Sequence, residues 1–165
     1  MPARIAIRPA VAADVPLILD LIRALGEYEW LAHEVVATEA GLHAQLFGKK
    51  PAAEVLIGEV DGQPAGFALF FHNFSTFLGQ PGLYLEDLFV RPEHRGSGLG
   101  KALMAELARI AIERDCGRFE WSVLDWNQPA IDFYRTLGAV GMDEWTVQRV
   151  SGAALRKLAT TAQPE

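Results

Sequence analysis

The chain has 165 residues, half of them hydrophobic, and a formal net charge of −6 at pH 7. This length suits a single domain, residues 1–165, with a substantial buried core. The acidic balance argues against nucleic-acid binding, because proteins of that class present basic surfaces. No apolar run approaches the ~20 residues that a membrane-spanning helix requires, so we expect no membrane partner.

Location and metal content follow from a few residue types. Residues 1–9 contain two arginines and no apolar signal core, and Cys116 has no second cysteine with which to form an internal disulfide. We therefore expect a cytoplasmic protein. The four histidines are scattered without the spacing of a metal site, so we expect no metal.

The first half of the chain predicts a strand followed by two helices. Residues 4–8 alternate polar and apolar side chains, which is typical of a strand. Asp14 is placed to cap a helix that runs to about Tyr28. Thr38 is placed to cap a second helix that Gly48 closes.

Three strands come next. Residues 54–60 and 63–74 flank Asp61-Gly62, a dipeptide that favours a tight hairpin turn. The apolar, β-prone segment 83–90 follows and predicts a central strand.

A glycine-rich turn joins this central strand to a helix predicted over residues 102–114. Its sequence is Arg95-Gly96-Ser97-Gly98-Leu99-Gly100-Lys101. Backbone N–H groups and the positive end of a helix dipole meet at such a turn, which favours a bound phosphate. The spacing of its glycines fits neither a P-loop nor a Rossmann turn.

The last third predicts a strand over residues 117–123, a short helix, a strand over 144–150 and a terminal helix after Ser151. Asn127 suits the cap of the short helix, Pro129 its first turn and Gly138 the position after its end.

The glycine turn and the segment 127–139 together resemble the two signatures of the GNAT superfamily of acyl-CoA N-acyltransferases. The predicted order of elements is similar to that fold over nearly the whole chain. The resemblance implies an α/β fold with a mixed, mostly antiparallel central sheet, two splayed parallel strands and flanking helices. Segments 83–90 and 126–134 look specifically like the diamine (spermidine/spermine) and thialysine N-acetyltransferase branch.

The resemblance also implies roles for individual residues, with acetyl-CoA as cosubstrate and a small amine as acceptor. Tyr134 is implied as the general acid, and Glu86 as the residue at the acceptor amine. The expected cofactor-binding residues are Leu88, Phe89, Val90, Arg95, Gly96, Ser97, Gly98, Leu99, Gly100, Lys101, Asn127, Pro129, Ala130 and Phe133. The expected acceptor-binding residues are Tyr28, Glu29, Glu86 and Glu144. Proteins similar to this branch are homodimers, and exposed Trp30, Phe74 and Phe77 would suit an interface.

The chemistry explains why such residues are needed. An alkylamine has a pKa of about 10.4, so a carboxylate must bind the ammonium group and help to remove its proton. Glu86 and Asp87 are neighbours on one strand, so one points inward and the other outward; we expect Glu86 to be the inward one. A phenol such as Tyr134 can protonate the departing thiolate.

Three alternatives stay open. The acceptor can be another small amine, an amino acid or an aminoglycoside. The chain can be a non-catalytic acyl-CoA-binding protein, or a nucleotide-binding protein that uses the glycine turn. The segment 138–145 is shorter than the corresponding acidic segment of the animal polyamine enzymes. This difference weakens the case for spermidine as the acceptor.

Overall fold

The computed structural model describes residues 1–162. The chain divides into two compact units, Met1–Ser122 and a second one that begins at Val123, and each is described by itself. The strands are β1 Ile5–Pro9, β2 Glu54–Val60, β3 Gln63–Ser75, β4 Gln80–Val90 and β5 Phe119–Trp121. The α-helices are α1 Val15–Tyr28, α2 Glu39–Phe47, α3 Leu99–Glu113, α4 Gln128–Thr136 and α5 Gly152–Ala159.

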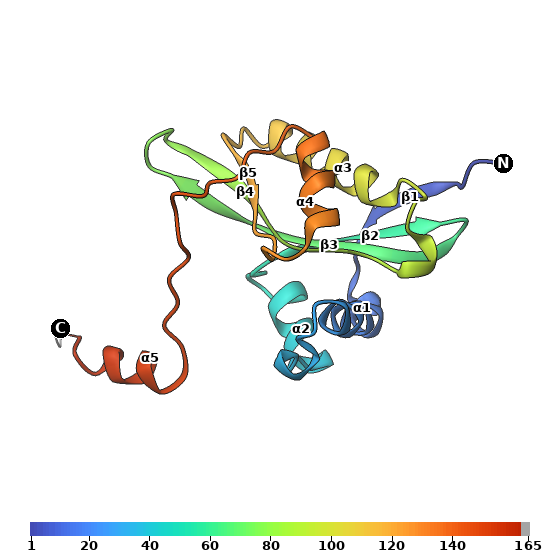
Figure 1. Cartoon of the computed structure of the whole chain (residues 1–165). Coiled ribbons are helices and arrows are strands. Elements are labelled where there is room, and N and C mark those ends of the chain that lie inside the picture. The colour runs from blue at the N-terminus through green and yellow to red at the C-terminus, as the bar shows by residue number, and fades with distance from the viewer. Residues whose placement is uncertain (163–165) are drawn as a thin grey trace. The chain divides into compact units, whose positions relative to one another are not determined.

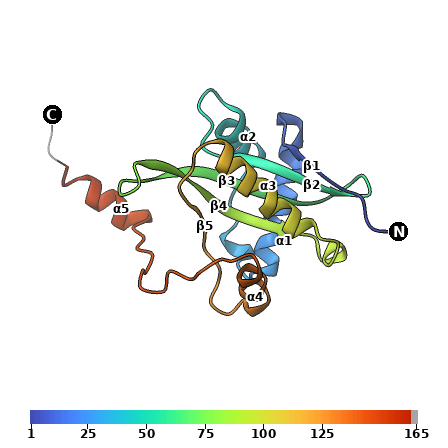
Figure 2. The ribbon, with the colours of Figure 1, turned by 90° about the horizontal axis from the view of Figure 1, so that it is seen from above.

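The first unit is built on a five-stranded sheet in the order β1-β2-β3-β4-β5. The first four strands pair antiparallel, and β4 pairs parallel with β5, so the predicted mixed α/β sheet is confirmed. Helices α1 and α2 lie on one face of the sheet and α3 on the other (Figure 1). Figure 2 shows α3 crossing over the strands.

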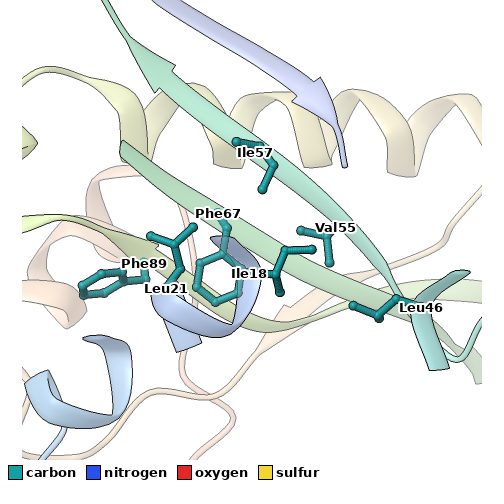
Figure 3. Packing of buried hydrophobic residues seen from close by; sticks show 7 residues of the cluster. All are labelled: Ile18, Leu21, Leu46, Val55, Ile57, Phe67 and Phe89. Carbon is teal, nitrogen blue, oxygen red and sulfur yellow. The ribbon is translucent and has the colours of Figure 1, made fainter. Parts of the chain in front are cut away.

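A buried hydrophobic cluster joins the first face of the sheet to its two helices (Figure 3). Ile18 and Leu21 of α1 meet Phe67 of β3 and Phe89 of β4 there, each at most 4% exposed. The remaining members are Leu46, Val55 and Ile57. Burying each such side chain contributes roughly 1.5–3 kcal/mol, so this cluster holds α1 against the strand that carries the candidate site.

Two glycines let α3 approach the opposite face closely. Gly58 of β2 pairs with Gly66 of β3, and the fully buried side chain of Leu99 packs against both. A Cβ on Gly58 would come within 2.6 Å of Leu99 Cδ1, and one on Gly66 within 2.4 Å of the Phe89 carbonyl oxygen. The sheet therefore fixes the first residue of α3, where the glycine turn ends.

The predicted helix caps are confirmed in two cases and differ in a third. Thr38 Oγ1 accepts a hydrogen bond from the Gly41 N–H at 3.1 Å, and Asn127 Oδ1 accepts one from Ala130 at 3.3 Å. Asp14 stands at the start of α1, but its carboxylate accepts hydrogen bonds from Arg8 rather than from the helix. The nearby guanidinium competes successfully for that acceptor because a charge-assisted pair is stronger than a neutral one.

The strand predicted over residues 144–150 is wrong: within the described residues 1–162, this segment pairs with nothing. Trp145 and Val147 are 79% and 77% exposed. A strand exists only where a neighbouring strand satisfies its backbone groups, so an alternating pattern alone does not form one. The strand predicted over 117–123 is present, but only as the three residues of β5.

Candidate active site

The central strand β4 carries an irregularity where the site was predicted. In the β3–β4 ladder Leu69 pairs with Asp87 and Phe70 with Leu85, so Glu86 is left without a partner. Two residues of β4 thus span one position of β3, which is a β-bulge. Such a bulge interrupts the ladder and redirects the side chains that follow it.

The bulge decides which of the two neighbouring carboxylates points inward. Glu86 is exposed, whereas Asp87 is half-buried and lies opposite Leu69, which packs against the hydrophobic cluster. The expected orientation is therefore wrong: the inward residue is Asp87. Sequence alternation missed Asp87 because a bulge leaves no signal in the residue pattern.

Asp87 has a strongly altered titration. Burial, together with the negative charges of Glu86 and Glu29, raises the pKa of Asp87 from an ordinary 3.8 to about 6. Glu29, the residue directly after α1, has its own pKa raised by burial. Three acidic side chains thus share one region of the first unit, a setting that favours a cationic group.

The glycine turn has the backbone geometry that the sequence predicts. Gly96 and Gly98 have φ values of +81° and +92°, in the left-handed region that glycine adopts without strain. Gly98 starts α3; the Leu99 N–H donates to Ser97 Oγ at 3.3 Å and the Ala102 N–H to the Gly98 carbonyl at 3.0 Å. The N–H groups of Gly100 and Lys101 belong to the first turn, at the positive end of the helix, where an anion is stabilised.

In the structure, Arg95, which is predicted to bind phosphate, contacts Tyr28, which is predicted to bind the acceptor. Arg95 Nε donates to the Val90 carbonyl at 3.3 Å, and its guanidinium carbon lies 4.4 Å from the centre of the Tyr28 ring. Leu88 and Val90 are half-buried and Phe89 buried, all on the stretch of β4 that leads into the turn. Lys101 is exposed on α3.

The second unit carries the remaining predicted residues. Asn127 is buried and caps α4, which contains Pro129, Ala130, Phe133 and Tyr134. The rings of the last two are 5.6 Å apart between centroids. Glu144 is exposed in the segment after α4.

Comparison with known proteins decides the family. The sequence model described as Acetyltransferase (GNAT) family matches residues 18–139. The chain belongs to the GNAT acetyltransferase family. As a GNAT N-acetyltransferase it transfers an acetyl group to an amine, and members of the family use acetyl-CoA.

Sequence matches to named relatives cover almost the whole length of this GNAT acetyltransferase. Thialysine N-epsilon-acetyltransferase of Sus scrofa is 39% identical, and the match covers 95% of this chain and 98% of the relative. L-ornithine N5-acetyltransferase of Arabidopsis thaliana is 34% identical over 92% of this chain and 86% of its own. A solved integron cassette protein from the mobile metagenome of V. cholerae superposes with a TM-score of 0.80 at 28% identity, covering 95% and 98% of the two chains.

Residues 1–162 carry neither a cluster of metal ligands nor a helix that could span a membrane. No three His, Cys, Asp or Glu side chains there come together in a way that would hold a metal ion. None of the helices in this range is long and apolar enough to cross a membrane.

Proposed function

We propose that this GNAT acetyltransferase acetylates the terminal primary amine of a thialysine-like amino acid or of a small diamine or polyamine. The observation that carries the proposal is the group of three carboxylates, Glu86, Asp87 and Glu29, whose charges interact in the first unit. An ammonium group is the natural counter-ion for such a group. The two named relatives act on thialysine and L-ornithine, whose names place the acetylated nitrogen on the side chain, and this supports an amino-acid acceptor.

The carboxylates have two tasks in the proposed reaction. They attract the protonated amine, and one of them takes a proton so that the nitrogen can attack the thioester carbonyl. Glu86 is the proposed proton acceptor, directly or through water, because its side chain is exposed at the bulge. Asp87, with a pKa of about 6, supports binding of the ammonium group from its half-buried position.

The remaining groups of the site act on the acyl donor. The backbone of Leu88, Phe89 and Val90 is proposed to hold the thioester end and to stabilise the oxyanion that forms on attack. The turn Arg95–Lys101 is proposed to bind the pyrophosphate, with left-handed glycines exposing the backbone. Asn127, Pro129, Ala130 and Phe133 are proposed to contact the pantetheine arm.

Tyr134 is the proposed general acid. The expelled thiolate needs a proton, and a phenol with a pKa of about 10 can supply one. Attack is direct: the signature segments contain no serine or cysteine beside a histidine base, so no acyl-enzyme is needed. Glu144 is proposed as a further acceptor contact.

The test is release of free CoA from acetyl-CoA with a panel of amines: thialysine, L-ornithine, lysine, putrescine, spermidine, spermine and an aminoglycoside. We expect the highest kcat/KM with thialysine or L-ornithine, and mass spectrometry should place the acetyl group on the side-chain nitrogen. If the aminoglycoside were turned over fastest, the acceptor would be an aminoglycoside and not an amino acid or a polyamine. Tight binding of acetyl-CoA without any turnover would favour the non-catalytic acyl-CoA-binding protein.

We also propose a single catalytic domain that forms a homodimer in the cytoplasm. Trp30, Phe74 and Phe77 are 83%, 64% and 96% exposed, which supports an interface. Light scattering should give twice the 18.1 kDa chain mass, and Phe77→Ser should shift the protein toward monomer. A monomer at micromolar concentration would contradict the homodimer.

A further inference from the structure

The contact between Arg95 and Tyr28 joins the proposed pyrophosphate-binding turn to the proposed acceptor side of the site. Arg95 belongs to the turn proposed to bind pyrophosphate, and Tyr28 is the last residue of α1, on the proposed acceptor side. The guanidinium carbon lies 4.4 Å from the ring centre, well within the range of a cation–π contact.

The geometry of a guanidinium allows Arg95 to serve both sides at once. Its guanidinium carbon lies over the Tyr28 ring, while its N–H donors lie in the plane of the guanidinium group. Nε already donates to the Val90 carbonyl at 3.3 Å, which fixes the orientation of that plane. The N–H donors on the two Nη atoms are of the kind that binds a phosphate oxygen.

Tyr28 in turn belongs to the segment that lines the acceptor side. Glu29 follows Tyr28 directly, and the negative charge of Glu29 is close enough to raise the pKa of Asp87 on the bulged strand. The end of α1 is closed by three backbone hydrogen bonds, from Glu29 to Leu25, from Trp30 to Glu27 and from Leu31 to Gly26, of 3.0, 3.2 and 2.8 Å. Holding the Tyr28 ring therefore restrains the backbone that presents Glu29.

We propose that Arg95 and Tyr28 couple the two substrate sites: a phosphate held by Arg95 fixes the Tyr28 ring and orders the end of α1 for the amine. The inference rests on the proposed function and adds positive cooperativity between acyl-CoA and amine. The coupling is reciprocal, so the amine tightens CoA binding by the same factor. We expect about two- to fivefold, the factor that a cation–π contact at an exposed site supplies.

Calorimetry measures the coupling directly. The dissociation constant of CoA is determined alone and with the amine that turns over fastest in the panel. We expect the amine to tighten CoA binding in the wild type and in Tyr28→Phe, which keeps the ring. Tyr28→Leu and Arg95→Lys, which lose the ring or the planar guanidinium, should bring the ratio to one. A ratio of one in the wild type, or an unchanged ratio in Tyr28→Leu, would overturn the coupling.

Hydrogen exchange supplies a readout that needs neither an amine nor turnover. CoA should slow exchange of the Glu29, Trp30 and Leu31 amides in the wild type and in Tyr28→Phe, but not in Tyr28→Leu. Protection without acetyl transfer to any amine would refute the proposed function, and with it the cooperativity with the amine, and would leave only the ordering of the end of α1 by CoA. Acetyl transfer without CoA-dependent protection in the wild type would refute the coupling alone.

Discussion

The two units of this GNAT acetyltransferase bury their side chains very differently. Among residues 1–162, every buried hydrophobic side chain lies in the first unit, from Val15 to Ala111. In the second unit, over the residues that the structure describes (123–162), only the polar residue Asn127 is buried. Trp145, Val147 and Leu158 are all more than half exposed there.

This difference shows how each half of the proposed site is held. Around the glycine turn, packing fixes the backbone: Leu99 fits against Gly58 and Gly66, and Phe89 lies in the hydrophobic cluster. The helix that carries Tyr134 has no buried residue of its own, and local features mark its two ends: the Asn127 cap and the left-handed Gly138, whose φ is +90°. We therefore expect substitutions at the turn to act on binding, and those around α4 to act on turnover and local stability.

The largest effect should come from Gly98→Asp, which places a carboxylate at the start of α3 and strains a backbone with a φ of +92°. We expect CoA affinity to fall by more than about 100-fold, a loss of roughly 3 kcal/mol, measured by calorimetry. Gly98→Asn is the matched control, because asparagine tolerates left-handed backbone and adds no charge. If both variants bound CoA like the wild type, the phosphates would have to lie elsewhere.

Tyr134→Phe should lower kcat by about 100-fold, as loss of a general acid does, with little change in acetyl-CoA affinity. Stopped-flow release of CoA and calorimetry separate the two quantities. Tyr84→Phe is the matched control: it removes a hydroxyl that lies 2.9 Å from Ser122 Oγ in the first unit. A wild-type kcat in Tyr134→Phe would remove this tyrosine from the mechanism.

How much of the fold and of the site was predictable depends on whether a feature is local in the chain, and both kinds of feature occur in both units. Most of the local motifs were predicted correctly from the sequence: the Asp61-Gly62 hairpin, the Thr38 and Asn127 caps, and the backbone of the glycine turn. The Asp14 cap was not, because Arg8 from another segment takes its carboxylate. The correctly predicted motifs depend on φ angles and on hydrogen bonds within a few residues, so the sequence specifies them directly.

Features that depend on pairing between distant segments were not predictable in the same way. The bulge at Glu86 arises from how β3 and β4 align, and it reversed the expected orientation of Glu86 and Asp87. The close fit of Leu99 against Gly58 and Gly66 joins residues far apart in the chain. The segment 144–150 has the residue pattern of a strand but no pairing partner within the described residues.

Asp87→Asn tests the bulged strand through two opposite effects: the variant should be more stable than the wild type but should use the amine less well. Folded Asp87 has a pKa of about 6 and the ordinary value is 3.8, so between these values the folded state binds more protons than the unfolded state. This residue therefore costs stability as the pH rises from about 4 to about 6, by roughly 2–3 kcal/mol. We expect Asp87→Asn to be more stable than the wild type at pH 7, with a smaller difference at pH 4.5, in urea unfolding.

The same variant should use the amine less well. Loss of the charge is expected to raise the KM of the amine about tenfold, and the fall of wild-type kcat/KM below pH 6 should disappear from the profile. Glu86→Gln is the comparison: it should lower kcat for the amine without moving the stability profile. Wild-type amine kinetics in Asp87→Asn would make this carboxylate a structural group only.

The smallest effect concerns the cap of α4. Asn127→Ala removes the acceptor for the Ala130 N–H and should cost about 1 kcal/mol of unfolding free energy, whereas Asn127→Asp keeps an acceptor and should cost less. Because no hydrophobic side chain among residues 123–162 is buried, we expect kcat to fall with the cap, and Asn127→Asp to restore most of it. A kcat that stayed at the wild-type value in Asn127→Ala would mean that Tyr134 is positioned by contacts other than this cap, and the contrast between the two units would weaken accordingly.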